Sequence, residues 1–145
     1  MKNVLIVNGP NMNMLGHREK DKYGLLSLDE INDIILKYAK TKNIEVSFFQ
    51  SNSEGNIIDK IQTSIEKHDF CIINAGAYTH YSYAIRDAIA SIETPVIEVH
   101  ITNVFNREEF RKKSVISSVC IGSISGFGYH SYLLAIDAID KMKER

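Results

Sequence analysis

The stretch VLIVNGPN, residues 4–11, decides the fold class of this chain. Four apolar residues, Val4–Val7, are followed directly by polar and turn-forming residues, which indicates a short strand buried on both faces. Similar runs, mostly β-branched or aromatic, recur along the chain at Val46–Phe49, Phe70–Ile73, Val96–Val99 and Val119–Ile121. Such runs are typical of a parallel sheet that is covered by helices on both faces.

Helical patterns fill the intervals between these runs. Ser27 and Glu30 supply a capping box ahead of the first helix, and apolar residues then recur at helical spacing. The positions that mark the four helices span 28–38, 57–65, 84–89 and 133–142. The alternation predicts one catalytic α/β domain over residues 1–145, a flavodoxin-like three-layer sandwich with a five-stranded parallel sheet.

Composition narrows the function classes. The chain has 145 residues, a net charge of −1 and 24% charged residues, as in an ordinary globular protein. It has no excess of basic residues that would favour nucleic acid or an anionic membrane, although the net charge leaves a local basic patch open. Cys71 and Cys120 lie in apolar runs and lack metal-ligand spacing, which favours a structural role in the core. The N-terminal apolar run is too short for a signal peptide, so we expect a soluble, cytoplasmic protein without membrane or nucleic-acid partners.

Residues 9–27 break the alternation, because they carry no clean helix or strand period. Long ordered connections of this kind are commonly active-site lids, although a disordered surface loop fits the pattern equally well. Gly16 and Gly24 bracket the charged portion and could serve as hinges, so a lid around residues 16–24 is the functional interpretation.

Polar side chains follow four of the predicted strands where each strand ends. Ligands of doubly wound sheets bind outside the carboxyl ends of the strands, so this edge is the expected site. The polar segments are Asn8–Asn11, Gln50–Asn52, Asn74–Gly76 with Thr79 and His80, and Glu98–Asn103.

Three groups at this edge suggest proton chemistry. Glu98 and His100 are two residues apart on one strand, so the carboxylate could orient the imidazole. His80 is predicted at a helix start, where the macrodipole disfavours imidazolium, although it could simply cap the helix. Tyr23 follows Arg18 in the lid, and a nearby guanidinium favours a phenolate, since a free tyrosine with a pKa of about 10 is a poor base.

Other patterns are weaker. The turn GSISGFGYH, residues 122–130, lacks the third glycine of a dinucleotide fingerprint and is best explained as a tight strand-to-helix connection. The charged run FNREEFRKKS, residues 105–114, is mostly a solvated helical face from which one arginine could reach an anionic ligand. The five histidines show no metal-binding spacing.

Several segments together resemble one family, the type II 3-dehydroquinate dehydratases. They occur in the family's order and spacing, span nearly the whole chain, and include the pair Tyr23-Gly24. The matching segments are NGPNMNMLGHRE (8–19), FFQSNSEG (48–55), INAGAYTHYSYAIRDAI (73–89), PVIEVHITNVFNREEFRKKS (95–114) and GFGYHSYLLA (126–135).

The resemblance implies a reversible anti elimination of water from 3-dehydroquinate to 3-dehydroshikimate through an enolate, a shikimate-pathway reaction without metal, organic cofactor or imine. Tyr23 matches the family's proton-abstracting base and Arg18 the arginine that supports the phenolate. Asn11 matches the asparagine that positions a water at the enolate, and His100 the general acid, which Glu98 would orient.

The resemblance also implies the binding residues and the assembly. Asn74, His80 and Arg111 match positions that bind the substrate, and the backbone of Ile101 and Thr102 matches the carboxylate-binding turn. Asp87 matches an acidic residue that the family lends to a neighbouring subunit's site. Family members are commonly homo-oligomers, dodecamers built as four trimers.

Four positions depart from the family pattern. His17 stands where arginine is common, Lys20 where proline is frequent, Ala77 for a glycine and Thr102 for a serine. The first two lie in the predicted lid, so they bear on its rate of closure or on substrate affinity rather than on the chemistry.

Two other functions remain open from the residues alone. A flavodoxin-like small-ligand binding module would use the glycine-rich turn, and a yellow protein or tight flavin binding would favour it. A catalytically weakened relative kept for assembly or regulation would show a normal oligomer without turnover.

Overall fold

A single sheet of five parallel strands organises the computed structural model, which describes residues 1–142. The strand order is β2-β1-β3-β4-β5, and every neighbouring pair is parallel. The strands are β1 (Lys2–Asn8), β2 (Ile44–Gln50), β3 (Phe70–Asn74), β4 (Val96–His100) and β5 (Gly122–Ser125). The longer helices are α2 (Leu28–Thr41), α3 (Glu54–Lys67), α4 (Tyr83–Ala90) and α5 (His130–Lys141).

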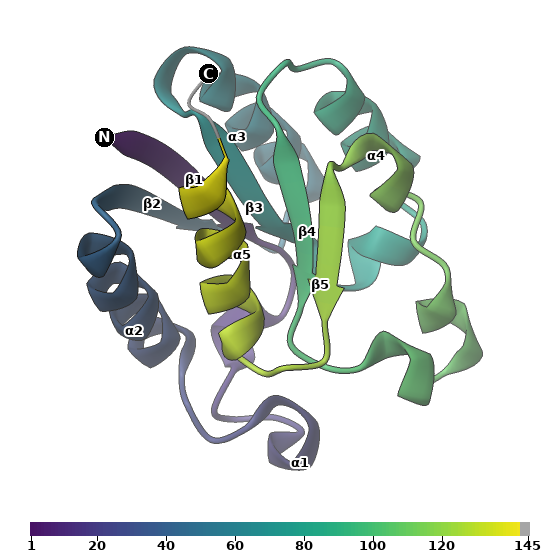
Figure 1. Cartoon of the computed structure of the whole chain (residues 1–145). Helices are drawn as coiled ribbons and strands as arrows, with labels where there is room; N and C mark the ends of the chain where they lie inside the picture. Colours follow the sequence, from purple (N-terminus) through teal and green to yellow (C-terminus); the bar gives the residue numbers. More distant parts are fainter. Residues whose placement is uncertain (143–145) are drawn as a thin grey trace.

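Helices cover both faces of the sheet, as the buried strands require (Figure 1). On one face α2 and α5 pack against residues such as Val4, Ile6 and Ile72. On the other face α3 and α4 pack against Leu5, Val7 and Ile73. The predicted three-layer α/β sandwich is therefore confirmed.

The predicted start of α2 is also confirmed. Ser27 Oγ accepts from the Glu30 amide at 3.2 Å, and Glu30 Oε1 accepts from the Ser27 amide at 3.1 Å. This reciprocal capping box satisfies two donors that the first helical turn would otherwise leave free.

The fifth strand lies later in the chain than its predicted position, Val119–Ile121. A short 3-10 helix, Ser117–Val119, ends at the first residue of that run, and β5 begins at Gly122, directly after its last residue. The reason is that β5 is an edge strand with a half-exposed burial pattern, so it needs no continuous apolar run. Part of the glycine-rich stretch predicted as a turn is therefore this strand.

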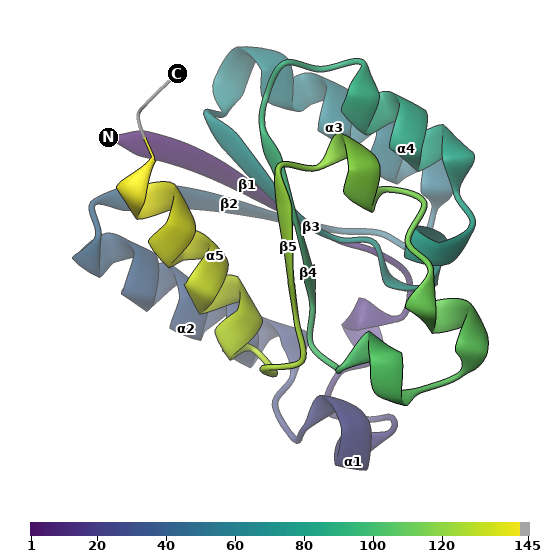
Figure 2. The same ribbon diagram turned by 45° about the vertical axis from the view of Figure 1, so that its right-hand side comes forward.

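The segment between β1 and α2 contains local structure that its sequence did not indicate. It holds a 3-10 turn, Met12–Met14, and a four-residue helix, α1 (Lys20–Tyr23), in which no residue is buried. Gly16 and Gly24 flank the charged part with φ values of +87° and +86°, a backbone conformation that glycine adopts without steric cost. Figure 2 shows α1 beyond the end of the sheet, next to the segment that follows β4.

The chain reverses its direction of winding between β1 and β3, which are neighbours in the sheet. Strand ends diverge at such a point, so the carboxyl ends of β1 and β3 are where a ligand site is expected. Within residues 1–142, no helix combines the length and apolar character needed to cross a bilayer.

Candidate active site

The site is built on a close approach of two loops at the ends of β1 and β3. Asn8 and Asn74 are register partners, and the Gly9 amide donates to the Asn74 carbonyl at 2.8 Å. A Cβ on Gly9 would lie 2.5 Å from the Ala75 carbonyl oxygen, which is inside van der Waals contact. Only glycine therefore lets the two strand ends meet at this spacing.

A small chamber of about 70 Å³ opens at this point and collects most of the predicted site residues. It is lined by nine of them, namely Asn11, Arg18, Tyr23, Asn74, His80, His100, Ile101, Thr102 and Arg111. Glu98 lies behind His100, and Asp87 lies elsewhere, on α4. Residues from strand ends and from the segment 9–27 thus converge in one place.

Tyr23 comes from α1 and reaches the chamber between two arginines. The Arg107 Nη1 atom donates to the Tyr23 hydroxyl oxygen at 2.6 Å, and the Arg18 guanidinium carbon lies 4.7 Å from the centre of the ring. Arg107 Nη1 also donates to Thr102 Oγ1 at 3.2 Å, and only 7% of the Arg107 side chain is exposed. Tyr23 therefore has one guanidinium bonded to its hydroxyl and a second over its ring.

Sequence reasoning missed Arg107, because it treated the run 105–114 as a solvated face. That interpretation holds for Glu109 and Lys112, which are exposed and pair with each other. The segment does not form the expected α-helix but two 3-10 turns, Val104–Asn106 and Glu109–Lys112, which direct both Arg107 and Arg111 inward. No periodic signal in a run so rich in charge separates its inward arginines from its outward lysines.

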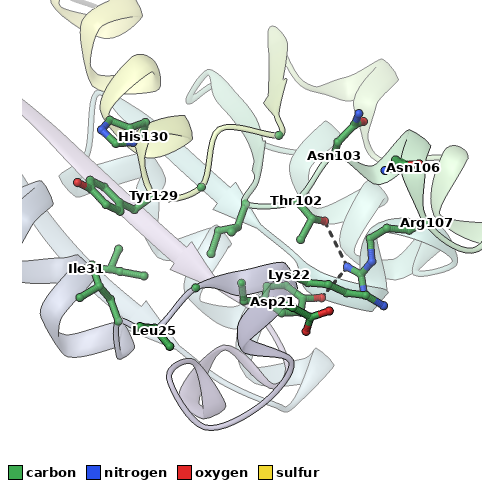
Figure 3. Close-up of a pocket in the computed structure, with 16 residues that line it drawn as sticks. Asp21, Lys22, Leu25, Ile31, Thr102, Asn103, Asn106, Arg107, Tyr129 and His130 are labelled. Atoms are coloured by element: carbon green, nitrogen blue, oxygen red, sulfur yellow. Dashed lines mark hydrogen bonds between the residues drawn. The ribbon is translucent and has the colours of Figure 1, made fainter.

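A larger cavity of about 600 Å³ (Figure 3) shares Tyr23, Ile101, Thr102 and Arg107 with the small chamber. The α1 residues Asp21 and Lys22 line one side, and Tyr129 and His130 line another. The larger cavity contacts only three predicted site residues, whereas the small chamber contacts nine, so the small chamber is the candidate active site.

His100 and Glu98 form the buried pair that their spacing predicts. The His100 Nε2 atom lies 2.5 Å from Glu98 Oε2, and both residues are buried. Ser114 Oγ donates to the other carboxylate oxygen at 3.1 Å, and Ser117 Oγ donates to the same atom. Burial by itself would raise the pKa of Glu98, but the bonds from His100, Ser117 and Ser114 outweigh it and hold that pKa below its ordinary value.

This arrangement leaves Glu98 an anion and the imidazole oriented. A carboxylate accepts from His100 Nε2–H, so the other ring nitrogen, Nδ1, is the one available for proton exchange in the chamber. The two serines act on Glu98 rather than on the imidazole, and sequence reasoning did not single them out.

His80 does not lie at the start of an α-helix, as predicted. It ends a 3-10 turn, Gly76–His80, three residues before α4, so no helix macrodipole acts on it from that direction. Burial lowers the pKa of His80, although its bond to the Lys113 carbonyl has the opposite effect. The expected neutral ring is retained for a different reason, and with Nδ1 donating at 2.7 Å to Lys113 O, Nε2 is left as an acceptor.

The turn carrying Ile101 and Thr102 is held from behind by the glycine-rich turn. The Gly126 and Gly128 amides donate to the carbonyls of His100 and Ile101, at 3.2 and 2.9 Å. The Phe127 amide donates to Ser131 Oγ at 3.2 Å. The three amides that a phosphate would need are therefore engaged within the chain, which argues against the flavin or phosphate module.

Asp87 is the predicted site residue that the chain does not bring to its own chamber. It lies on α4 with 72% of its side chain exposed, and it accepts from Arg86 Nη1 at 2.9 Å. Two exposed tyrosines precede it, Tyr83 as the first residue of the same helix and Tyr81 just before that helix.

Comparison with known proteins gives consistent results. The family model for dehydroquinase class II matches residues 2–140. The chain is 53% identical over 143 residues to a 3-dehydroquinate dehydratase of Caldicellulosiruptor saccharolyticus, covering 98% of this chain and 99% of that protein.

Solved structures agree with this match. The type II dehydroquinase of Butyrivibrio crossotus superimposes with a TM-score of 0.94 at 52% identity, over 97% of this chain and 98% of that one. The type II dehydroquinase of Propionibacterium acnes gives 0.95 at 35% identity, over 98% of both chains.

Proposed function

This chain belongs to the class II dehydroquinase family and is a lyase that dehydrates 3-dehydroquinate, and from that premise we propose that Tyr23 and His100 are its base and its acid. The observation that carries the assignment is Tyr23, with Arg107 bonded to its hydroxyl and Arg18 over its ring, in the same chamber as His100, which Glu98 holds from behind.

The first step is removal of the proton next to the ketone. The Tyr23 phenolate takes the proton, and the electrons of the broken C–H bond form an enolate. Arg107 and Arg18 favour the phenolate before the step, while a water held by Asn11 would donate to the enolate oxygen. Asn11 is suited to this position by its left-handed backbone, with φ of 68°, which turns the chain at the chamber wall.

The second step is loss of the hydroxyl group. Hydroxide is a poor leaving group, so His100 protonates it as the enolate collapses, the C–O bond breaks and water departs. Glu98 stabilises the imidazolium that precedes this transfer. The base comes from α1 and the acid from the end of β4, and we place them on opposite faces of the substrate, as an anti elimination needs.

The remaining chamber residues bind the substrate. We assign substrate oxygens to the Asn74 amide, the neutral His80 ring and the Arg111 guanidinium, and the carboxylate to the backbone of Ile101 and Thr102. Segment 16–24 is the lid, whose closure excludes water and strengthens the charge interactions around Tyr23.

We propose that the reaction uses no imine. Among residues 1–142 no lysine lines the small chamber, so an amine nucleophile is missing where the ketone would lie. Borohydride added with 3-dehydroquinate should therefore leave the intact mass of the protein unchanged, whereas a trapped lysine adduct would refute the enolate route.

The test of the base follows the ultraviolet absorbance of the conjugated enone product. The wild-type protein should show rapid growth without added metal, and Tyr23→Phe should lower kcat by about 10²- to 10⁴-fold while substrate still binds by calorimetry. A near-wild-type rate in Tyr23→Phe would mean that another group removes the proton.

We also propose a homo-oligomer, a dodecamer of four trimers, in which Asp87 completes a neighbour's site. The exposed Asp87 and the exposed Tyr81 and Tyr83 beside it support this arrangement. A cytoplasmic location is consistent with the two unpaired cysteines, since oxidising compartments favour disulfides. Light scattering of the purified protein tests the assembly.

A further inference from the structure

A buried tyrosine on α5 connects the substrate chamber to the first strand. Tyr132 is completely buried, and its hydroxyl lies between two buried asparagines at the ends of β1 and β3. The Tyr132 hydroxyl donates to Asn8 Oδ1 at 2.5 Å and accepts from Asn74 Nδ2 at 3.0 Å. Neither Asn8 nor Tyr132 is among the residues that line the small chamber, whereas Asn74 is.

These bonds fix which way the Asn74 amide points. Asn74 Oδ1 accepts from the Gly76 amide at 3.2 Å, so the oxygen is held on the side of that loop. One hydrogen on Asn74 Nδ2 is taken by Tyr132, and the second hydrogen is then the group that Asn74 can offer in the chamber. A flipped amide would set Nδ2 against the Gly76 N–H, two donors facing each other.

The direction of the chain of bonds is set by Asn8. A phenol has a single hydrogen to donate, and it goes to Asn8 Oδ1, which obliges the Tyr132 oxygen to act as acceptor toward Asn74. Burial raises the pKa of Tyr132 above its ordinary value of 10, so the phenol keeps this hydrogen at neutral pH. The two hydrogen bonds therefore run in one direction, from Asn74 Nδ2 to the Tyr132 hydroxyl and from that hydroxyl to Asn8 Oδ1.

Packing alone does not need this hydroxyl. The ring lies in the core formed with α2 and β1, where phenylalanine would fill nearly the same volume. The hydroxyl lies in the buried core, where a polar group without a hydrogen-bond partner costs free energy. Its two hydrogen bonds both go to asparagines at the strand ends.

We propose that Tyr132 is a positioning residue for substrate binding, which holds the Asn74 amide with its nitrogen toward the chamber as a donor to a substrate oxygen. This inference rests on the proposed role of Asn74 as a substrate-binding residue. Tyr132 touches no substrate and acts only through Asn74.

The experiment compares Tyr132→Phe with Tyr38→Phe. Tyr38 is a matched control, since its hydroxyl also makes a short bond, 2.6 Å to Asp137 on α5, but this bond joins α2 to α5 and Tyr38 lines no part of the small chamber. Tyr132→Phe should raise the KM for 3-dehydroquinate about tenfold with a smaller fall in kcat, as expected for one lost hydrogen bond. Tyr38→Phe should keep both constants.

A purely structural role predicts a different result. It would lower the Tm and the active fraction, which reduces kcat at an unchanged KM. The double variant Tyr132→Phe/Asn74→Ala separates the two further, because its KM should lie within about twofold of that of Asn74→Ala if both residues act on one contact.

The proposal is overturned if folded Tyr132→Phe has the wild-type KM, or if its effect multiplies with that of Asn74→Ala. Should Tyr132→Phe fail to fold, Asn8→Ala frees the phenolic hydrogen and should raise KM by a smaller factor, and a wild-type KM there overturns the proposal as well. Failure of the proposed function would appear separately, as wild-type turnover in Tyr23→Phe or as wild-type binding in Asn74→Ala.

Discussion

The Arg107 guanidinium binds the Tyr23 hydroxyl oxygen at 2.6 Å across a gap of 84 residues in the sequence. The tyrosine belongs to a four-residue helix without a buried residue, whereas the arginine side chain is 7% exposed and also bonded to Thr102. This contact therefore has two effects. It holds α1 against the segment after β4, and it places a positively charged guanidinium next to the hydroxyl of the proposed base.

Comparing a substitution of Arg107 with one of a nearby exposed lysine separates the effect of this contact from the effect of losing a surface charge. Arg107→Gln should lower kcat about 10- to 100-fold, the range expected for removing a hydrogen bond to a charged group. Lys112→Gln is the control, because Lys112 lies on the same segment, is exposed and pairs only with Glu109 among the ion pairs found in residues 1–142. Equal rates in Arg107→Gln and wild type would leave Arg18 as the sole support of the phenolate.

The buried Glu98 makes stability depend on pH in the acid range. Its pKa in the folded protein lies below the ordinary 4.5, so its stabilising effect is complete above pH 4.5 and is lost as pH falls through the lowered value. Glu98→Gln should cost about 1–3 kcal/mol of unfolding free energy at pH 7.

Urea unfolding at several pH values checks this. Between pH 6 and pH 3 the advantage of the wild type over Glu98→Gln should shrink as pH falls below about 4.5, so the two curves approach each other. Curves that stay parallel over this range would show that Glu98 does not titrate as a hydrogen-bonded anion.

The close approach of the strand ends can be tested with two glycines. Gly9→Ala should destabilise the protein by about 1–3 kcal/mol, because the new methyl group would lie 2.5 Å from the Ala75 carbonyl oxygen. Gly55→Ala, in the first turn of α3, meets only Ser53 Oγ at 3.9 Å and should stabilise by up to about 1 kcal/mol. Chemical denaturation of both variants measures the difference, and similar effects would mean that the approach tolerates a side chain.

Mixed assemblies test whether Asp87 serves a neighbouring subunit. Tyr23→Phe and Asp87→Ala should each be nearly inactive as pure assemblies. Coexpressed in equal amounts, they should recover about a quarter of wild-type activity, since that share of sites combines an intact Tyr23 with an intact neighbouring Asp87. No recovery in verified mixed assemblies would place Asp87 in the site of its own subunit.

Most of the fold follows from local patterns in the sequence. Strands buried on both faces, such as β3, are predicted from continuous apolar runs. The helix α2 is predicted from its capping box and the spacing of its apolar residues. The edge strand β5 was misplaced because a strand with one neighbour has little apolar requirement. The helix α1 was missed because its four residues bury nothing and so carry no periodic signal.

The candidate site divides in a similar way. The pairing of Glu98 with His100 follows from the two-residue period of a strand. The residues alone also singled out His80 and the pair Arg18 and Tyr23, and the resemblance supplied the roles of the other positions. Arg107, Ser117 and Tyr132 could not be found in this way, because each acts through a partner that is distant in sequence and each sits in a pattern with an ordinary structural explanation.

The bond between Tyr132 and Asn8 joins positions 124 residues apart, so it ties nearly the last element of the chain to the first. During synthesis β1 leaves the ribosome long before α5, so this bond cannot form until the last helix has been made. The Asn74 amide therefore acquires its final orientation only when the C-terminal helix has docked. Efficient substrate binding therefore requires α5 to be in place. A nascent or C-terminally truncated chain that has already assembled β1 to β4 would still bind its substrate poorly.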